Sequence, residues 1–285
     1  MPISAQKLLS LHIPDIAQRY TGKDAILYAL SLGVGQDPLD KRQLAFVTGD
    51  HPKVLPTFAV TLAFSPFWLR DLDTGVDFLK VVHGEEQLLL HRPLPPHGYV
   101  TGRMRIVDVI DKGAGKGALL VCERVLADES TGETFATLTE TIFCRGDGGF
   151  EGTKREARPP HPVPERAPDM ACDLPTRPET ALLYRLSGDT NPLHSNPDVA
   201  RAAGFERPVL HGLATFGIAG HALLKAICDY EPERLAAMAG RFTAPVYPGE
   251  TIRTEMWREG RIVSFRARAV ERDVIAIDNG RAEVR

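Results

Sequence analysis

The chain has few cysteines, no excess of basic residues and no long apolar run. None of the cysteines belongs to a Cys-x-x-Cys pair, so their spacing suggests neither a zinc site nor a disulfide framework and favours reduced thiols: Cys122, Cys144, Cys172 and Cys228. The formal net charge is −3, which offers no basic surface for nucleic acid. Since no stretch of about 18 apolar residues and no signal-peptide pattern occurs, we expect a cytoplasmic protein without a membrane span.

Two kinds of terminal or cofactor motif are also missing. The last residues read AEVR, which is not a peroxisomal SKL-type address. No Gly-x-Gly-x-x-Gly region for a dinucleotide occurs. We therefore expect no nicotinamide or flavin cofactor, and the sequence suggests no metal site.

The segment RPPHPVPERAP, residues 158–168, holds five prolines in 11 positions and favours extended polyproline geometry. We interpret residues 156–176 as a linker between an N-terminal half (1–155) and a C-terminal half (177–285). The alternative is a rigid surface loop within one domain.

The two halves share short matches in the same order. YALSLGVGQDPL matches YRLSGDTNPL, LPTFAV matches LATFGI, and PLPPHG matches PVYPG, at nearly constant offset, which suggests a duplicated unit. Where the second copy carries Asp189, Asn191 and His194, the first has Gly and Gln and ends in Asp40. The first copy therefore lacks the polar residues of the second.

Hydrophobic patterning indicates an α+β fold. Residues 213–228 are apolar nearly all round, as in a buried helix, and 24–33 also favour a helix. Apolar and polar residues alternate in several strand-like runs: 100–110, 117–127, 135–144, 251–257, 261–270 and 273–278. We expect two antiparallel sheets, each wrapped around a central helix.

The segment GDTNPLH, residues 188–194, places a carboxylate and an imidazole five residues apart across an Asn-Pro turn. Asp189 and His194 can bind one water between them and move its protons, which is general acid–base catalysis. Asn191 can orient the water or hold the loop. The alternative is that these side chains only cap a turn. The Gly212 N–H, at the start of the predicted buried helix, is a candidate donor to a developing oxyanion.

The stretches YRLSGDTNPLH and FERPVLHGLATFG resemble the signature of MaoC-like dehydratases, in particular the (R)-specific enoyl-CoA hydratases 2. The likeness covers nearly the whole chain and extends to the two-half unit of peroxisomal multifunctional enzyme type 2. It implies a double hotdog fold whose N-terminal half has lost the catalytic motif and helps accommodate a bulky acyl chain. The implied reaction is reversible syn hydration of a trans-2-enoyl-CoA to a (3R)-3-hydroxyacyl-CoA.

The resemblance also implies roles for single residues. Asp189 and His194 would form the dyad, Asn191 would support it, and the Gly212 amide would bind the thioester oxygen; which dyad member is acid and which is base stays open. Lys112 would lie near the CoA phosphates. The remaining substrate-binding candidates are His83, Gly84, Thr190, Pro192, Leu193 and Phe242. CoA is part of the substrate, so no separate cofactor is implied.

Two other functions compete with this interpretation. A hotdog thioesterase would direct water at the thioester carbonyl, and a non-catalytic subunit would only bind acyl-CoA. The intact Asp-x-Asn-Pro-x-His motif argues against both. The acyl chain and the physiological direction are open. A homodimer is expected because hotdog sheets pair, although two hotdog units in one chain also suit a monomer.

Overall fold

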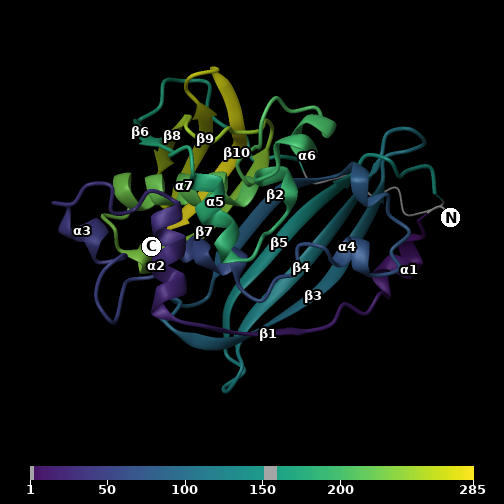
Figure 1. The fold of residues 1–285 in the computed structure, drawn as a ribbon, viewed down its shortest axis with the longest axis horizontal. Helices are drawn as coiled ribbons and strands as arrows, with labels where there is room; N and C mark the ends of the chain where they lie inside the picture. The colour runs from purple at the N-terminus through teal and green to yellow at the C-terminus, as the bar shows by residue number, and fades with distance from the viewer. Residues whose placement is uncertain (1–2, 151–158) are drawn as a thin grey trace.

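A computed structural model describes residues 3–150 and 159–285. Ten strands form one continuous sheet in the order β1-β3-β4-β5-β2-β7-β10-β9-β8-β6, with every neighbouring pair antiparallel (Figure 1). The strands are β1 (Ile16–Tyr20), β2 (Val81–Leu90), β3 (Gly98–Asp111), β4 (Ala118–Asp128), β5 (Thr134–Cys144), β6 (Met170–Pro175), β7 (Leu235–Phe242), β8 (Thr251–Glu259), β9 (Ile262–Ala269) and β10 (Val274–Val284).

Helices and 3₁₀ turns connect the strands and cover part of the sheet. They are α1 (Ala5–Leu9), α2 (Gly22–Ser31), α3 (Lys41–Leu44), η1 (Pro56–Thr61), α4 (Trp68–Asp71), η2 (Phe78–Lys80), α5 (Thr180–Tyr184), η3 (Arg185–Ser187), η4 (Pro192–His194), α6 (Pro197–Ala202), α7 (Gly212–Ala226) and η5 (Pro232–Arg234). No helix of the described ranges is both long and apolar enough to span a bilayer.

The two halves meet edge to edge within the sheet. Strands β1 to β5 come from the first half and β6 to β10 from the second, and β2 pairs with β7. Glu85 lies opposite Arg241 across this joint and accepts a hydrogen bond from its Nε at 2.8 Å. The expected two sheets are therefore one, because pairing satisfies the backbone groups that each half would leave exposed at its edge.

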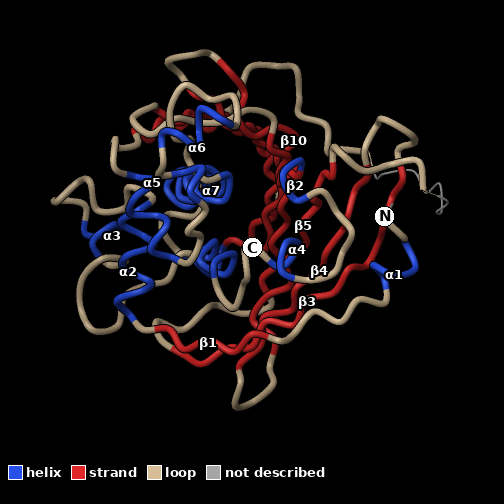
Figure 2. Tube along the Cα trace, turned by 45° about the vertical axis from the view of Figure 1, so that its right-hand side comes forward, coloured by secondary structure: helices blue, strands red, loops and turns tan. Residues whose placement is uncertain are grey.

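Helix α7 is the central helix of the second half. It contacts β6, β7, β8 and β10, and it also contacts η1 of the first half, while Figure 2 shows it enclosed between strands and the other helices. A Cβ on Gly217 would lie 2.8 Å from the Tyr28 hydroxyl of α2, and one on Gly220 would lie 2.7 Å from Cγ2 of Thr57. These two glycines let α7 approach the first half closely.

Among the described residues, the first half has no equivalent of α7. The matching segment LPTFAV folds instead as the short 3₁₀ helix η1, which begins at Pro56. It is followed by Leu62 in extended backbone and Ala63 in the left-handed region, at φ 47°. The expectation of a central helix in both halves is thus correct for the second half alone, because this backbone turn ends the helix after six residues.

Part of the predicted linker is structured. Residues 170–175 form β6, an edge strand that pairs with β8, so the second half of the sheet begins there. Residues 156–158 of the predicted linker lie outside the described residues. The burial of residues alternates along both edge strands, β1 and β6, but strands of five and six residues are too short to give a clear periodic signal in the sequence.

Candidate active site

Two side chains fold the loop after η3 onto itself. The loop leaves η3 at Gly188, whose φ of 121° suits glycine. Asp189 Oδ1 accepts a hydrogen bond from the Asn191 N–H, and Asn191 Oδ1 accepts one from the Leu193 N–H, both at 3.0 Å. Asn191 thereby caps η4, the turn that carries His194. Its side chain holds the loop, one of the two roles that the sequence suggested.

The ring of His194 is fixed by one backbone contact. Its Nδ1–H donates to the Val209 carbonyl oxygen at 2.8 Å, which leaves Nε2 of the neutral ring as an acceptor. Burial lowers the pKa of His194, although the Val209 carbonyl and the Asp189 carboxylate oppose that shift. The imidazole is therefore held neutral near pH 7, with one nitrogen ready to take a proton.

The side chains of Asp189 and His194 lie close to each other. A carboxylate oxygen of Asp189 and ring nitrogens of His194 and His211 all lie within 4.8 Å of one another. A separation above about 3.5 Å is too long for a direct hydrogen bond but suits a bridging water. The geometry therefore fits the sequence hypothesis of one water shared between Asp189 and His194.

His211 is a third imidazole in the site, to which sequence reasoning gave no role. Its side chain is 1% exposed and stacks on His194 with ring centroids 3.7 Å apart. Its Nε2–H donates to the Asp189 backbone oxygen at 3.2 Å, and its Nδ1 meets no partner among the described residues. Burial, and then the neighbouring His194, lower the pKa of His211 to about 2, so its ring stays neutral. Its hydrogen bond to the Asp189 backbone helps hold the loop in place. In the sequence, its position directly before the predicted buried helix was the signal that could have pointed to His211.

Gly212, Phe242 and His83 lie together beside the dyad. Gly212 is the first residue of α7, and within the described chain its N–H meets no acceptor. A Cβ on Gly212 would lie 3.4 Å from the ring of Phe242, whose centroid is 5.0 Å from that of His83. The fold thus brings Phe242 next to Gly212 and His83 next to Phe242, so predicted residues of both halves meet here.

The other predicted residues are spread around this cluster. Gly84 sits at the register shift of β2, where a Cβ would lie 3.1 Å from the Thr141 carbonyl oxygen. Thr190 and Pro192 are exposed on the dyad loop, and Leu193 is partly buried. All four therefore lie near the dyad or near His83, and none of them carries a charge.

Lys112 is separate from this group. It is exposed in the turn between β3 and β4, with Nζ 4.9 Å from the ring centroid of Phe143. The β3 end, at Asp111, is in register through β4 and β5 with Val81 of β2. Three strand spacings of about 4.8 Å put it roughly 14 Å from β2. A role of Lys112 toward the CoA phosphates stays a prediction.

The described part of the first half, residues 3–150, has no matching site. Asp40, which ends its degenerate motif, caps α3 by accepting a hydrogen bond from the Arg42 N–H at 2.9 Å. Its hydrogen bond with the Arg42 side chain lowers the pKa of this carboxyl to about 2. Gln36 reaches the Pro175 carbonyl oxygen instead of a ligand. The corresponding polar residues of the first half serve structure.

In the ranges that the structure describes, two groups have the residue types of a metal site: Asp189 with His194 and His211, and His83 with Glu86 and Glu140. In the first, the imidazole planes are only 27° apart and stacked, so their in-plane lone pairs do not converge on one ion. In the second, His83 Nε2 is already 3.0 Å from a Glu86 oxygen. The geometry of both groups favours hydrogen bonding over metal binding.

Comparisons with known proteins agree along the whole chain. Residues 160–280 match the model of the MaoC like domain, and residues 18–146 match that of the MFE-2 hydratase 2 N-terminal domain. The chain is 38% identical over 284 residues to the enoyl-CoA hydratase ChsH3 of Mycobacterium tuberculosis, with 98% of each chain covered. It is 38% identical over 287 residues to the peroxisomal enoyl-CoA hydratase 2 of Arabidopsis thaliana, covering 93% of this chain and 91% of that protein.

A solved structure extends the likeness to three dimensions. The MaoC-like dehydratase from Phytophthora capsici superposes with a TM-score of 0.87 at 32% identity, and the superposition covers 98% of both chains. A hypothetical protein of Mycobacterium tuberculosis described as a double hotdog fold superposes with a TM-score of 0.56 at 16% identity, which concerns the fold alone.

Proposed function

Because the chain belongs to the MaoC-like family in its two-half hydratase 2 form, we propose that it reversibly adds water to a trans-2-enoyl-CoA and yields a (3R)-3-hydroxyacyl-CoA. The observation that carries the proposal is the arrangement of Asp189 and His194 on one capped loop, beside the free N–H of Gly212. The reaction needs an acid–base pair and an oxyanion donor, and these three residues are the candidates for those roles.

The proton of the attacking water can be followed through the site. The neutral His194 has its acceptor at Nε2, so this nitrogen takes one proton while the water oxygen bonds to Cβ. The π electrons move onto the thioester oxygen, where the Gly212 N–H stabilises the enolate. The imidazolium then returns its proton to Cα from the same side, which gives syn addition. The Asp189 carboxylate accepts a hydrogen bond from the water and stabilises the imidazolium. The alternative, with Asp189 as the base, uses the same atoms.

A single assay separates this reaction from the competing functions. Mixing the protein with a trans-2-enoyl-CoA should remove the absorbance of the conjugated thioester without releasing free thiol, and chiral analysis should find the 3R product. Thiol release would instead identify a thioesterase, and no change in either signal would leave only acyl-CoA binding. An S product would contradict the stereochemistry proposed here.

The rate should depend on pH through His194. Because burial lowers the pKa of this histidine, the ring stays neutral somewhat below pH 6.5 and loses its acceptor only when protonated at lower pH. We therefore expect the acid limb of kcat/KM for hydration to fall below pH 6.5. The measurement is a pH profile of kcat/KM with a short enoyl-CoA. An acid limb above pH 6.5 would contradict the neutral imidazole.

The remaining expectations concern the cellular location, the cofactors and the oligomeric state of the enzyme. The four cysteines are all free and buried, which fits a reducing cytoplasm. Acid–base hydration requires neither a metal nor a separate organic cofactor, and the acyl-CoA is the small-molecule partner. A homodimer stays a prediction, to be measured by the mass of the protein in solution.

A further inference from the structure

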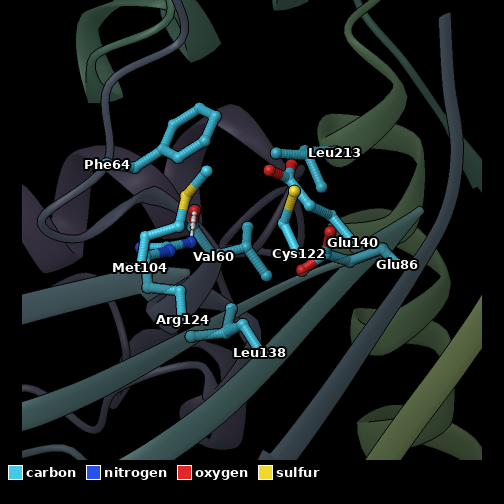
Figure 3. Close-up of a pocket in the computed structure, with 9 residues that line it drawn as sticks. All are labelled: Val60, Phe64, Glu86, Met104, Cys122, Arg124, Leu138, Glu140 and Leu213. Carbon is cyan, nitrogen blue, oxygen red and sulfur yellow. Dashed lines mark hydrogen bonds between the residues drawn. The ribbon is translucent and has the colours of Figure 1, made fainter. Parts of the chain in front are cut away.

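A cavity with mixed charge lies in the first half, between η1 and the sheet. The free space inside it is small and holds about one water-sized group. Apolar and ionisable side chains are mixed along its wall: Figure 3 shows Arg124 beside Met104, and Glu86 and Glu140 on the side of Cys122 and Leu213. The lining residues are Val60, Phe64, Glu86, Met104, Cys122, Arg124, Leu138, Glu140 and Leu213. A pocket for a purely alkyl chain would need none of these charged groups.

Arg124 is the cation of this cavity. Its side chain is 6% exposed, and its two terminal nitrogens donate to the backbone oxygens of Leu62 and of Val60, the latter at 2.9 Å. These bonds cap η1 and explain why an arginine is buried there. A guanidinium has five N–H donors, so two bonds leave further donors unassigned among the described residues.

The two carboxylates of the cavity, Glu86 and Glu140, differ in their hydrogen-bond partners. Glu86, 4% exposed, has an oxygen 3.0 Å from Nε2 of His83. Glu140 differs, because its Oε1 is buried and meets no hydrogen-bond partner in the described part of the chain. Burial raises the pKa of Glu140, so its carboxyl takes up a proton more readily than that of an exposed glutamate. When the protein supplies no partner, a buried polar atom of this kind normally bonds a water or a ligand group.

The cavity adjoins the proposed catalytic site. Leu213, which lines it, directly follows Gly212 at the start of α7. His83 bonds Glu86 of the cavity and also contacts Phe242, the ring that lies over Gly212. A chain leaving a thioester held at Gly212 therefore has this cavity as its neighbour.

We propose that the cavity receives a hydroxyl group carried on the acyl chain of the substrate, away from the thioester. The inference rests on the proposed function and narrows its substrate class. A hydroxyl both donates and accepts, so it can bond Glu140 Oε1 in either protonation state and accept from Arg124. A plain alkyl chain would leave both polar groups unpaired, and a carboxylate would meet two glutamates.

The test compares matched substrates. Plain trans-2-enoyl-CoA thioesters of increasing length are paired with thioesters of the same length that end in a hydroxyl, and kcat/KM for hydration is measured for each. Where the hydroxyl reaches the cavity, the wild-type enzyme should prefer the hydroxylated substrate by about tenfold or more, since an unpaired buried polar group costs about that factor. Equal or reversed preference at every length would overturn the proposal, and this comparison needs no variant.

Two variants test whether Glu140 causes the preference for hydroxylated substrates. Glu140→Leu should reduce the ratio of the two kcat/KM values to about one, because the acceptor is removed. The matched control is Glu123→Leu on the same sheet, whose side chain lies on the opposite face of β4 from Arg124 and bonds Arg105; it should keep the wild-type ratio. An unchanged ratio in a folded Glu140→Leu protein would also overturn the proposal.

The same experiment distinguishes a failure of the hydroxyl-binding proposal from a failure of the proposed hydratase function. If no enoyl-CoA of any length is hydrated, including the short trans-2-butenoyl-CoA, the hydratase assignment itself fails. If short and long plain substrates are hydrated as well as hydroxylated ones, the hydratase assignment stands and the polar cavity has no part in substrate choice.

Discussion

Replacing Asp189 by Asn should lower kcat for hydration by about 10³-fold, within the range of a lost acid–base group. The substitution is conservative for the loop, because the Asn side-chain oxygen can still accept from the Asn191 N–H as Asp189 Oδ1 does. What it removes is the negative charge that holds the water and stabilises a protonated His194. His194→Gln should cause a loss of the same order, since glutamine cannot take the proton at the Nε2 position.

The two residues should act as a unit. If one water is shared between them, the double variant Asp189→Asn with His194→Gln loses little more than the worse single variant, because either change already disables proton transfer. The control is Asp198→Asn in α6, a surface carboxylate paired with Arg201, which should keep wild-type kcat. Thermal unfolding should show that all these proteins fold. Near-normal kcat in both single variants would remove the dyad from the mechanism.

Gly212→Pro should lower kcat by about 10²- to 10³-fold, the typical effect of losing one oxyanion donor. The change deletes the N–H and adds the proline ring at the first residue of α7, a position where proline is tolerated. The preceding His211 has φ −58° and ψ 136°, a conformation that a residue before proline readily adopts. The helix should therefore persist while the thioester oxygen loses its donor.

The control for Gly212→Pro is Gly212→Ala, which adds a carbon but keeps the N–H. The new Cβ would lie 3.4 Å from the Phe242 ring, an ordinary contact. We expect Gly212→Ala to lose far less activity than Gly212→Pro. Equal losses would mean that space around Phe242 matters more than the amide. Full activity in the proline variant would assign the oxyanion to another donor.

The strands that alternate apolar and polar residues were predictable. The runs at 100–110, 117–127 and 135–144 lie within or overlap β3, β4 and β5, and the three C-terminal runs overlap β8, β9 and β10. By contrast, β7 is buried along its first four residues, so it shows no alternation, and β2 is irregular around its bulge at Gly84. These two strands join the halves, so the single sheet could not be inferred from periodicity.

Only part of the candidate site could be predicted from the sequence. Asp189, Asn191 and His194 are close in the chain, and their turn chemistry is local, so spacing alone suggested one small site. His211 is 22 residues from Asp189 and contacts its backbone only because α7 packs where it does. A stack of two imidazoles has no periodic signature, and the sequence therefore left this residue without a role.

By itself, the sequence determined the family, the loop that carries Asp189 and His194, and the glycine that begins the buried helix, since each depends on neighbouring residues and their backbone preferences. The tertiary structure alone decided that the halves share one sheet and that Glu86, Arg124 and Glu140 face a common cavity. These three residues lie on three different strands, β2, β4 and β5. Which side chains meet across a sheet depends on strand order and register, and long-range backbone pairing determines both.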